Sequence, residues 1–318
     1  SAASDVYKRQ PWNIAMVHTI YNLAITAILM PFTKYLVKLG KWLVKAKDET
    51  APKDSMQYAP DLLLLRSPSV ALQECDHYTF RMAGTARDSL ERAISLIGAY
   101  NEQDAEVVLK QEDTLDLYED RLDTYLVYLS AQALSQQDSR RVGKMQHAIG
   151  DFERLGDHAV NLTENAQEFL DRSASLSPTA HQELMVLREV LGEILDYTYK
   201  AFAATDYEAA RHIEPVEEVV DDLVATLRAN HIRRVRDGQC TVYAGLTFLD
   251  ILVNVERIAD QCSNVGVFTL SMFDEHIMNN HHDYIQALHQ GKDPVFNRAY
   301  QEAHDKYFGE LKRIERSK

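Results

Sequence analysis

The sequence Glu-Arg-Leu-Gly-Asp-His-Ala-Val-Asn-Leu at residues 153–162 recurs in altered form at residues 256–265, as Glu-Arg-Ile-Ala-Asp-Gln-Cys-Ser-Asn-Val. Glu, Arg, Asp and Asn occupy the same places in both copies, and apolar residues coincide at the third and tenth places. Similarity at a fixed separation marks a duplicated structural unit. This stretch therefore predicts a fold built from two copies of one unit.

Helical periodicity extends outward from both copies. The chain has only 12 Gly and 8 Pro among its 318 residues, and no run alternates apolar and polar residues as a strand would. A Ser-rich break at 171–178 separates two groups of three predicted helices. These helices are 69–98, 104–135 and 138–172, then 179–204, 206–236 and 241–274. The expected fold class is all-α, with tandem three-helix bundles at 69–172 and 179–275 and a helical tail at 276–318.

Each unit carries two Glu-x-x-x-Asp pairs, one on its second predicted helix and one on its third. Carboxylates four residues apart share a helix face and repel each other by about 0.2–0.5 kcal/mol per pair. Clustered carboxylates are also the ligands of hard cations. We therefore expect a cluster of divalent or trivalent metal ions (Fe, Mn, Mg or Zn). Its expected ligands are Glu119, Asp123, Glu153 and Asp157 in the first unit, and Glu218, Asp222, Glu256 and Asp260 in the second.

Two other interpretations of these pairs remain open. They could form a solvated acidic face, or Arg154 and Arg257 could neutralise them in ion pairs. Gly156 permits a closer helix approach than Ala259 at the matching place, so we expect the first unit to hold metal more tightly. His158 is interpreted as a packed or surface residue and not as a ligand.

Other chemistries lack their motifs in this sequence. The three cysteines, at 75, 240 and 262, lie far apart, so neither a disulfide framework nor a cysteine zinc site is expected. No phosphate-binding glycine loop, nucleophile elbow or Cys/His pairing occurs. We therefore do not expect an enzyme, and a helical metalloenzyme is the weakest alternative. The net charge of −14 argues against nucleic acid as a partner.

An uncharged, mostly apolar run from Trp12 to Met30 precedes the repeats. Roughly 20 such residues suffice to span a bilayer, so we predict a transmembrane helix; the alternative is a buried helix of a soluble protein. Lysines follow on one helical face, which predicts an interfacial helix that ends near residue 47 on the cytoplasmic side. Polar positions inside the span indicate contact with further membrane helices. These positions are Asn13, His18, Thr19 and Asn22.

Two further segments complete the predicted organisation. Residues 1–10 match nothing around them and lack the apolar core of a signal peptide, and we interpret them as an artefact. Residues 11–47 hold the membrane and interfacial helices. Residues 48–68 contain three prolines and mixed charge, which is typical of a linker. The expected location is the cell inner membrane, with everything after about residue 48 in the cytoplasm.

The duplicated motif resembles the third-helix motif of PhoU domains, a family of tandem three-helix bundles. Asp138-Ser-Arg is similar to the Asp-Leu-Arg that opens this helix in the family, with Ser139 in place of Leu. The second copy departs further, because Ala259 replaces Gly. The resemblance implies a multinuclear metal cluster bound through the acidic pairs.

His18-Thr-Ile-Tyr-Asn22 resembles a segment late in the membrane domain of bacterial sodium/phosphate cotransporters, in which a PhoU domain follows the last membrane helix. This resemblance implies the C-terminal part of a sodium-dependent phosphate transporter with its cytoplasmic regulatory domain. The implied partners are inorganic phosphate, Na⁺ and the membrane, and a homo-oligomer is left open. The alternative function is a membrane-anchored PhoU-like adaptor in phosphate signalling.

Overall fold

The computed structural model describes residues 58–171, 176–240, 242–274, 277 and 280–316, together with 16, 19–23 and 25. The chain divides into two compact units, Ser1–Ser55 and Met56–Lys318. All regular secondary structure in the described residues is helical. The predicted all-α class is therefore confirmed for this part of the chain.

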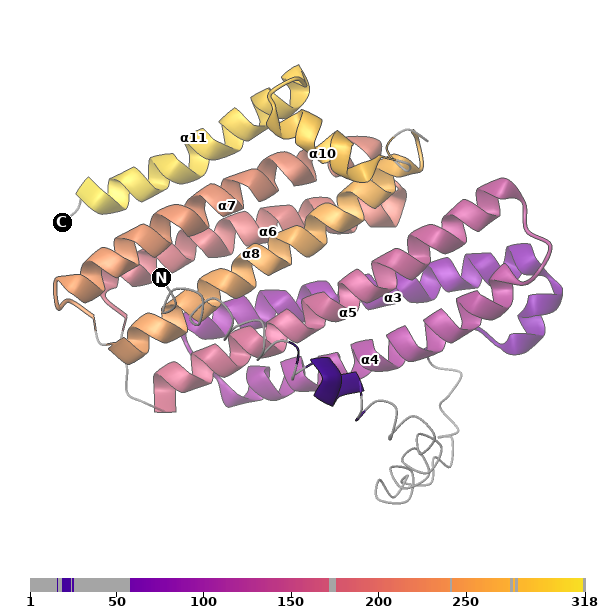
Figure 1. The fold of residues 1–318 in the computed structure, drawn as a ribbon, viewed down its shortest axis with the longest axis horizontal. Coiled ribbons are helices and arrows are strands. Elements are labelled where there is room, and N and C mark those ends of the chain that lie inside the picture. Colours follow the sequence, from indigo (N-terminus) through magenta and orange to yellow (C-terminus); the bar gives the residue numbers. More distant parts are fainter. Residues whose placement is uncertain are drawn as a thin grey trace, which may run out of the picture. The chain divides into compact units, whose positions relative to one another are not determined.

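Six long helices form the body of the second unit (Figure 1). Their bounds closely follow the predicted ranges, because apolar residues recur at helical spacing and capping residues start the helices. The first group is α3 (Pro68–Gly98), α4 (Glu102–Ser130) and α5 (Gln136–Asp171), and the second is α6 (Pro178–Ala204), α7 (Tyr207–Arg236) and α8 (Val242–Ser271).

Capping side chains fix where several helices begin. Asn101 accepts a hydrogen bond from the backbone N–H of Gln103 at the start of α4. Asp206 accepts from two backbone N–H groups at the start of α7. Ser177 caps α6, whose first residue is Pro178. Such caps supply partners for backbone N–H groups that a helix leaves unpaired at its start.

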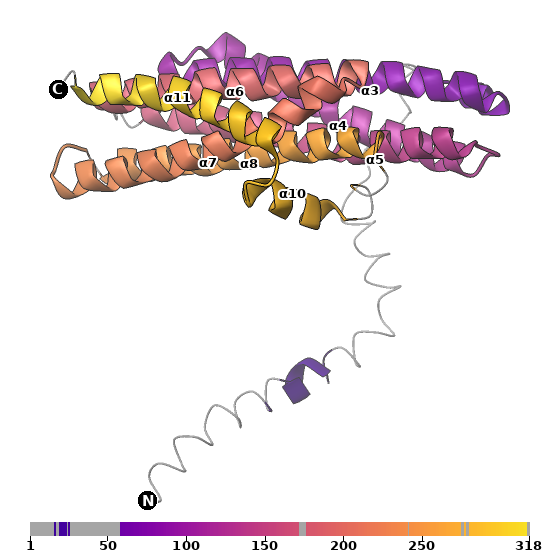
Figure 2. The ribbon, with the colours of Figure 1, turned by 90° about the horizontal axis from the view of Figure 1, so that it is seen from above.

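The two helix groups pack on each other through α5 and α8, which lie side by side (Figures 1 and 2). Their contact contains polar bonds between the repeats. His158 Nδ1 lies 3.1 Å from Oδ1 of Asn254, and Thr247 donates to Glu168 at 2.9 Å. His158 is thus a packed residue at the repeat contact, in line with its sequence-based interpretation.

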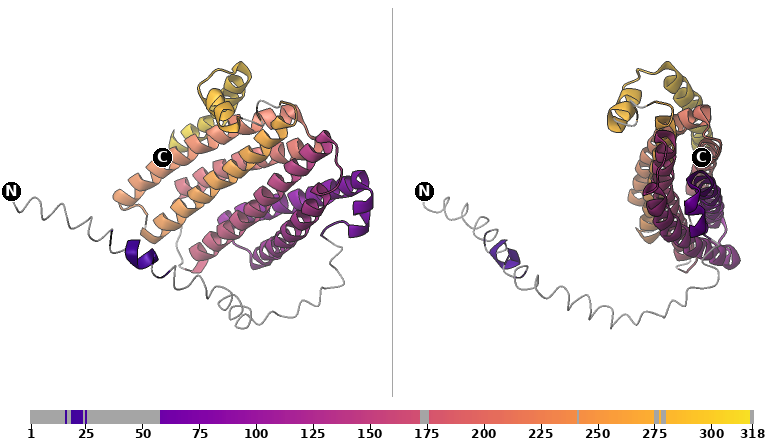
Figure 3. Two further views of the ribbon diagram at one scale, coloured as in Figure 1. Left: turned by 45° about the vertical axis from the view of Figure 1, so that its right-hand side comes forward. Right: turned by 90° about the vertical axis from the view of Figure 1, so that its right-hand side faces the viewer.

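Two C-terminal helices, α10 (His281–His289) and α11 (Pro294–Arg316), follow the repeats. α11 packs along α7 and α6, at the edge of the unit away from α4 (Figure 3). The turn between α10 and α11 contains Gly291 with a φ of 72°, a conformation that glycine adopts without steric cost. The tail therefore covers the second repeat.

The end of the predicted linker belongs to the first helix group. Leu62–Arg66 forms a short 3₁₀ helix, η2. The Tyr58 ring meets the edge of the Tyr118 ring at 5.1 Å, and the Tyr125 hydroxyl donates to the carbonyl of Asp61 at 3.1 Å. Residues 58–67 thus pack on α4. The prediction of a plain linker overlooked the aromatic contacts that Tyr58 makes across 60 residues of sequence.

The first unit contains the predicted membrane segment. Its described residues, 16, 19–23 and 25, are all helical. The rest of the predicted span and the lysine-rich helix lie outside the described residues. Within the described part of the chain, we find no helix that is both long enough and apolar enough to cross a membrane.

Candidate metal centre

The second and third helices of each repeat pack against each other, α4 with α5 and α7 with α8. Their acidic residues therefore meet along the helix contacts. Three of the carboxylates predicted for the first repeat, Glu119, Glu153 and Asp157, come together, and Asp123 lies next to Glu119. Glu119 interacts electrostatically with Asp123 on its own helix and with Asp157 on α5, and Glu153 interacts with Glu119 and Asp157.

Crowding and burial change the acidity of this first cluster. Burial is the largest cause that raises the pKa of Glu153 to about 7, and the charges of Asp157 and Glu119 raise it further. Burial also raises the pKa of Glu119, with Asp116 the largest charge contribution. Such shifts mean that the metal-free site favours protonated carboxyl groups. A bound cation would reverse that preference.

Two carboxylates that the prediction left out also belong to the first cluster. Glu112 and Asp116 each interact with Asp157 across the helix contact. They form a Glu-x-x-x-Asp pair whose members lie seven and three residues before Glu119. Sequence reasoning did not choose them, because the matching of the repeats placed the pair at Glu119 and Asp123.

Arginine does not neutralise the first cluster by direct pairing. Arg154 Nη1 lies 3.6 Å from Asp151 Oδ1, so the guanidinium group pairs with an acid outside the predicted set. Among the described residues, no lysine or arginine forms an ion pair with Glu119, Glu153 or Asp157. The interpretation that Arg154 neutralises these acids in ion pairs is therefore wrong. Its positive charge still acts on Glu153 from a distance and offsets some of the increase in that pKa.

In the second repeat, the carboxylates gather around Glu217. This side chain is 7% exposed. Burial raises its pKa to about 9, and Glu214, Asp221 and Asp260 raise it further by charge repulsion. Burial and the charges of Glu256 and Asp260 raise the pKa of Asp221 to about 6. The predicted Asp260 and Glu256 thus lie in this cluster.

The other two predicted residues of the second repeat have different partners. Asp222 accepts a hydrogen bond from the Tyr300 hydroxyl of α11 at 2.6 Å. Glu218 Oε2 lies 3.3 Å from His289 Nδ1 of α10. Glu256, in addition, pairs with Arg228 at 3.1 Å. The prediction matched Glu218 and Asp222 with Glu119 and Asp123 of the first repeat. The sequence did not reveal that the tail helices would contact these two side chains.

The acidic pair that faces α8 is one residue earlier, at Glu217 and Asp221. Both interact with Asp260, as Glu112 and Asp116 interact with Asp157 in the first repeat. The two pairs have the same spacing, and each lies opposite the Asp of its repeated motif. A match of Glu112-x-x-x-Asp116 to Glu217-x-x-x-Asp221 was available in the sequence.

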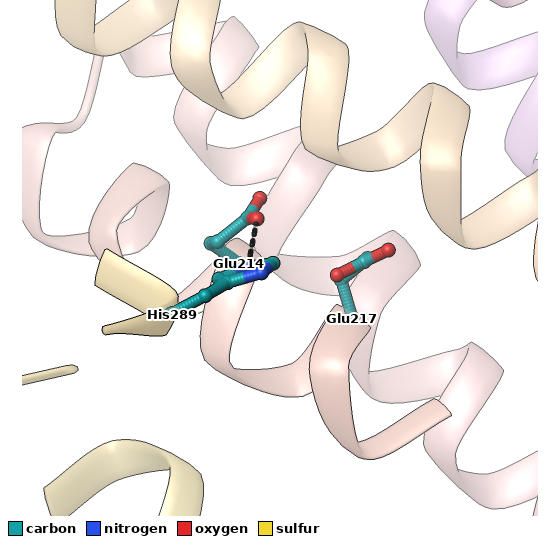
Figure 4. Close-up of side chains that lie close together, drawn as sticks. All are labelled: Glu214, Glu217 and His289. Atoms are coloured by element: carbon teal, nitrogen blue, oxygen red, sulfur yellow. Dashed lines mark hydrogen bonds and ion pairs between the residues drawn. The ribbon is translucent and has the colours of Figure 1, made fainter. Parts of the chain in front are cut away.

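His289 adds an imidazole to the second cluster. One ligand atom each from Glu214, Glu217 and His289 lies within 4.8 Å of the other two (Figure 4). His289 Nε2 is 2.8 Å from Glu214 Oε1, and Ser263 donates a hydrogen bond to the other oxygen of Glu214. Sequence reasoning missed His289, because the tail showed no repeat and no metal-ligand spacing.

Small residues allow both helix contacts to be tight. A Cβ atom on Gly156 would lie 2.5 Å from Leu115 Cδ1, and one on Gly266 would lie 2.8 Å from Ile213 Cδ1. The second repeat therefore has its own close approach, seven residues after Ala259. The expectation that the first repeat binds metal more tightly stays a prediction.

The residues present fit a metal ion. Both clusters offer several carboxylate oxygens without enough cations to balance them, and carboxylates are the ligands that hard cations take. Glu217 is buried and has no hydrogen-bond or ion-pair partner in the described part of the chain. A buried carboxyl group without a partner is costly, and a cation would offset that cost.

Two of the predicted polar positions of the membrane segment, Asn13 and His18, lie outside the described residues. Thr19 and Asn22 lie in the described helical stretch 19–23 of the first unit. The structure therefore leaves the proposed role of these four side chains as a prediction.

Comparison with known proteins gives a consistent family result. The model of the PhoU domain matches residues 79–166 and 184–268, which together make up more than half of the chain. Each match falls in one of the two helix groups. The tail helices α10 and α11 lie outside both matches.

Individual relatives are similar over most of their length. The phosphate-specific transport system accessory protein PhoU homolog 1 of Thermotoga maritima is 22% identical over 217 residues, which cover 67% of this chain and 87% of the relative. The phosphate-specific transport system accessory protein PhoU of Escherichia coli is 26% identical over 59% of this chain and 77% of the relative. The crystal structure of PhoU from Pseudomonas aeruginosa shares the fold, with a TM-score of 0.60 at 18% identity, over 66% of this chain and 99% of that one.

Proposed function

The chain belongs to the PhoU domain family, and from this premise we propose that it is an accessory, regulatory protein of phosphate transport and not an enzyme. The relatives that it matches are named accessory proteins of phosphate-specific transport systems. One observation supports the proposal most directly: each repeat places a Glu-x-x-x-Asp pair of its second helix against the Asp of its repeated motif. A solvated acidic face would not need this arrangement in both repeats.

We further propose that these clusters bind metal cations. In the first repeat, Glu112, Asp116, Glu119, Glu153 and Asp157 would hold the ion or ions, with Asp123 at the edge. In the second, the ligands would be Glu217, Asp221, Glu256 and Asp260. A bound cation supplies positive charge that balances the clustered carboxylates and can present open coordination positions to an anionic or acidic partner. The protein residues themselves bind and orient the cation.

A genetic experiment tests the regulatory function. Deletion of the gene in the source organism should change phosphate uptake and phosphate-responsive gene expression. The wild-type gene should restore both, and a Glu153→Gln, Asp157→Asn variant should not. Asp120→Asn is the matched control, because Asp120 is an exposed acid on α4 that faces Arg121. Unchanged uptake and expression after deletion would contradict the proposal.

A second candidate function rests on the N-terminal sequence. The uncharged run at 12–30 and the lysine face after it support the regulatory region of a sodium/phosphate cotransporter, with phosphate and Na⁺ as the transported species. In this reading the chain lies at the inner membrane, with residues after about 48 in the cytoplasm. Cysteine labelling tests it: Lys47→Cys should resist an impermeant reagent in intact cells. Reaction from outside would show that the orientation is wrong.

A further inference from the structure

His289 lies at the end of α10, outside the two stretches that match the PhoU domain, yet it reaches the carboxylates of α7. Its Nε2 lies 2.8 Å from Glu214 Oε1 and its Nδ1 lies 3.3 Å from Glu218 Oε2. Figure 4 shows the imidazole beside Glu214, with Glu217 on the next turn of the same helix. Both ring nitrogens therefore face carboxylate oxygens.

The two contacts of the imidazole cannot both be hydrogen bonds from a neutral ring to ionised carboxylates. A neutral imidazole carries a proton on one nitrogen and a lone pair on the other. If Nδ1–H donates to Glu218, the lone pair of Nε2 faces a carboxylate oxygen of Glu214, which is repulsive. A proton shared by Nε2 and Glu214, or a cation between them, removes this repulsion. A histidine that donates one N–H to a carboxylate while its other nitrogen binds metal is a common arrangement in metal sites.

Glu217 provides the independent reason to favour a cation. It is 7% exposed and has no hydrogen-bond or ion-pair partner within the part of the chain that the structure describes. One of its oxygens lies within 4.8 Å of the ligand atoms of Glu214 and His289. The contacts of His289 with Glu214 and Glu218 leave Glu217 without a partner. A cation among the three groups would serve all of them.

The tail holds His289 in this place through several contacts. Arg211 of α7 donates to both oxygens of Asp293, at 3.0 and 3.3 Å. These bonds connect the turn after α10 to α7. Leu288 and Phe296, on either side of the turn, are 6% and 7% exposed. Tyr300 then bonds to Asp222 on α7. The imidazole is thus positioned by packing and ion pairing that do not depend on metal.

We propose that Glu214, Glu217 and His289 form a transition-metal site in which the tail of the chain completes the second repeat. His289 Nε2 and the two glutamates are the ligands, and Glu218 orients the imidazole by accepting its Nδ1–H. The proposal rests on the proposed cation binding by the second repeat and names its metal class. Imidazole suits Zn²⁺, Cu²⁺, Fe²⁺ or Ni²⁺, whereas carboxylates alone suit Mg²⁺, Ca²⁺ or Mn²⁺.

The two repeats should therefore differ in metal preference. The first cluster contains only carboxylates among the described residues, so it should take hard cations such as Mg²⁺. The second should prefer Zn²⁺, because it adds a nitrogen ligand at the same acidic pair. Metal at this site also ties α10 to α7, since the ligands come from both helices. Occupancy is then coupled to how firmly the tail is held.

Titration of the full chain with Zn²⁺ and, separately, with Mg²⁺ tests the site. His289→Ala should weaken Zn²⁺ binding by at least about 10-fold, and Glu217→Gln should do the same. Mg²⁺ binding should be unchanged by His289→Ala. His212→Ala is the matched control, because His212 is also a histidine close to α7 acids but bonds to the backbone of its own helix. Zn²⁺ affinity that His289→Ala leaves unchanged would overturn the proposal.

A spectroscopic measurement keeps the test valid if His289→Ala lowers the melting temperature. Cu²⁺ added to the wild-type chain should show nitrogen hyperfine splitting in its electron paramagnetic resonance spectrum, and His289→Gln should lose that nitrogen signal. An identical spectrum in both proteins would show that His289 is not a ligand. Asp157→Asn separates the two proposals: if it lowers the number of Mg²⁺ ions bound while His289 variants change no metal affinity, carboxylate binding stands and the tail site fails.

Discussion

Gly156 on α5 packs directly against Leu115 on α4, so closely that a Cβ atom at position 156 would lie 2.5 Å from Leu115 Cδ1. Each of these residues immediately precedes a carboxylate of the first cluster. Leu115 is fully buried, so its side chain has little room to move. The contact therefore sets the distance between the two helices that carry the candidate ligands.

We expect Gly156→Ala to destabilise the protein by about 1 kcal/mol. An added methyl group in a packed contact costs about 1–3 kcal/mol, and the better helix propensity of Ala returns about 0.8–1.0 kcal/mol. Urea unfolding measures the net change. Gly150→Ala is the control on the same helix, because a Cβ there meets nothing within 4 Å. It should stabilise the protein, and loss of stability in both variants to the same degree would show that the contact with Leu115 is not the cause.

Asp157→Asn should change stability in opposite directions with and without metal. In the metal-free protein it removes repulsion from Glu112, Asp116 and Glu153, so the melting temperature should rise slightly. With Mn²⁺ present, the wild-type protein should be the more stable of the two, because binding to the folded state raises its stability. Melting curves in a chelator and in Mn²⁺ give the comparison. A lower melting temperature for the variant in both conditions would point to a purely structural role.

The sequence predicted the helices and the first cluster because both depend on local spacing. Apolar periodicity placed the six long helices, and the repeated motif placed Glu153 and Asp157 on one face of α5. Glu119 then came close because α4 packs against α5. Glu119, Glu153 and Asp157 lie close together because their two helices pack against each other, so this part of the prediction did not depend on how the two repeats were matched.

The second cluster was predicted less well because its partners come from distant parts of the chain. Tyr300 bonds to Asp222 from 78 residues away, and His289 reaches Glu214 from 75 residues away. No local pattern reports such contacts. A one-residue error in matching the repeats was enough to choose Glu218 in place of Glu217, since adjacent residues on a helix point in directions about 100° apart.

The buried ion pair between Arg234 and Glu183 should contribute strongly to stability. The side chains are 6% and 1% exposed, and the closest atoms are 2.7 Å apart. Arg234→Met leaves Glu183 buried without its partner, which should cost about 3–5 kcal/mol. Arg236→Met, two residues on at an exposed site, should change stability by less than about 0.5 kcal/mol. Equal unfolding midpoints in denaturant for these two variants would show that the ion pair between Arg234 and Glu183 does not stabilise the protein strongly.

Lys144 should make stability depend on alkaline pH. Burial lowers its pKa from 10.5 to about 8, although the charge of Asp76 opposes the shift. Between these two values the unfolded chain binds more protons than the folded protein, so the free energy of unfolding rises with pH. Below about pH 8 the full cost of the buried charge is present. The stability of wild type minus that of Lys144→Met should therefore increase from about pH 7.5 to 10, and a constant difference would argue against a buried charged lysine.

Asp221 and Asp222 are adjacent acids that should differ in their effect on metal binding. Asp221 faces α8, where Glu256 and Asp260 raise its pKa in addition to the effect of burial. Asp222 faces α11 and is bonded to Tyr300. Asp221→Asn should therefore weaken metal binding, whereas Asp222→Asn should leave metal affinity nearly unchanged.

The opposite pattern is expected for the attachment of the tail. Asp222→Asn replaces the charged acceptor of the Tyr300 hydroxyl with a neutral one, and a hydrogen bond to a charged group contributes about 1.5–3 kcal/mol against about 1 kcal/mol for a neutral one. Hydrogen exchange of α11 should therefore speed up in Asp222→Asn and not in Asp221→Asn. Mn²⁺ titration and hydrogen exchange of both variants decide whether Glu217 and Asp221 or Glu218 and Asp222 are the metal-binding pair. A greater loss of metal affinity in Asp222→Asn than in Asp221→Asn would show that Asp222 is a metal ligand. The pair predicted from the sequence, Glu218 and Asp222, would then be the correct one.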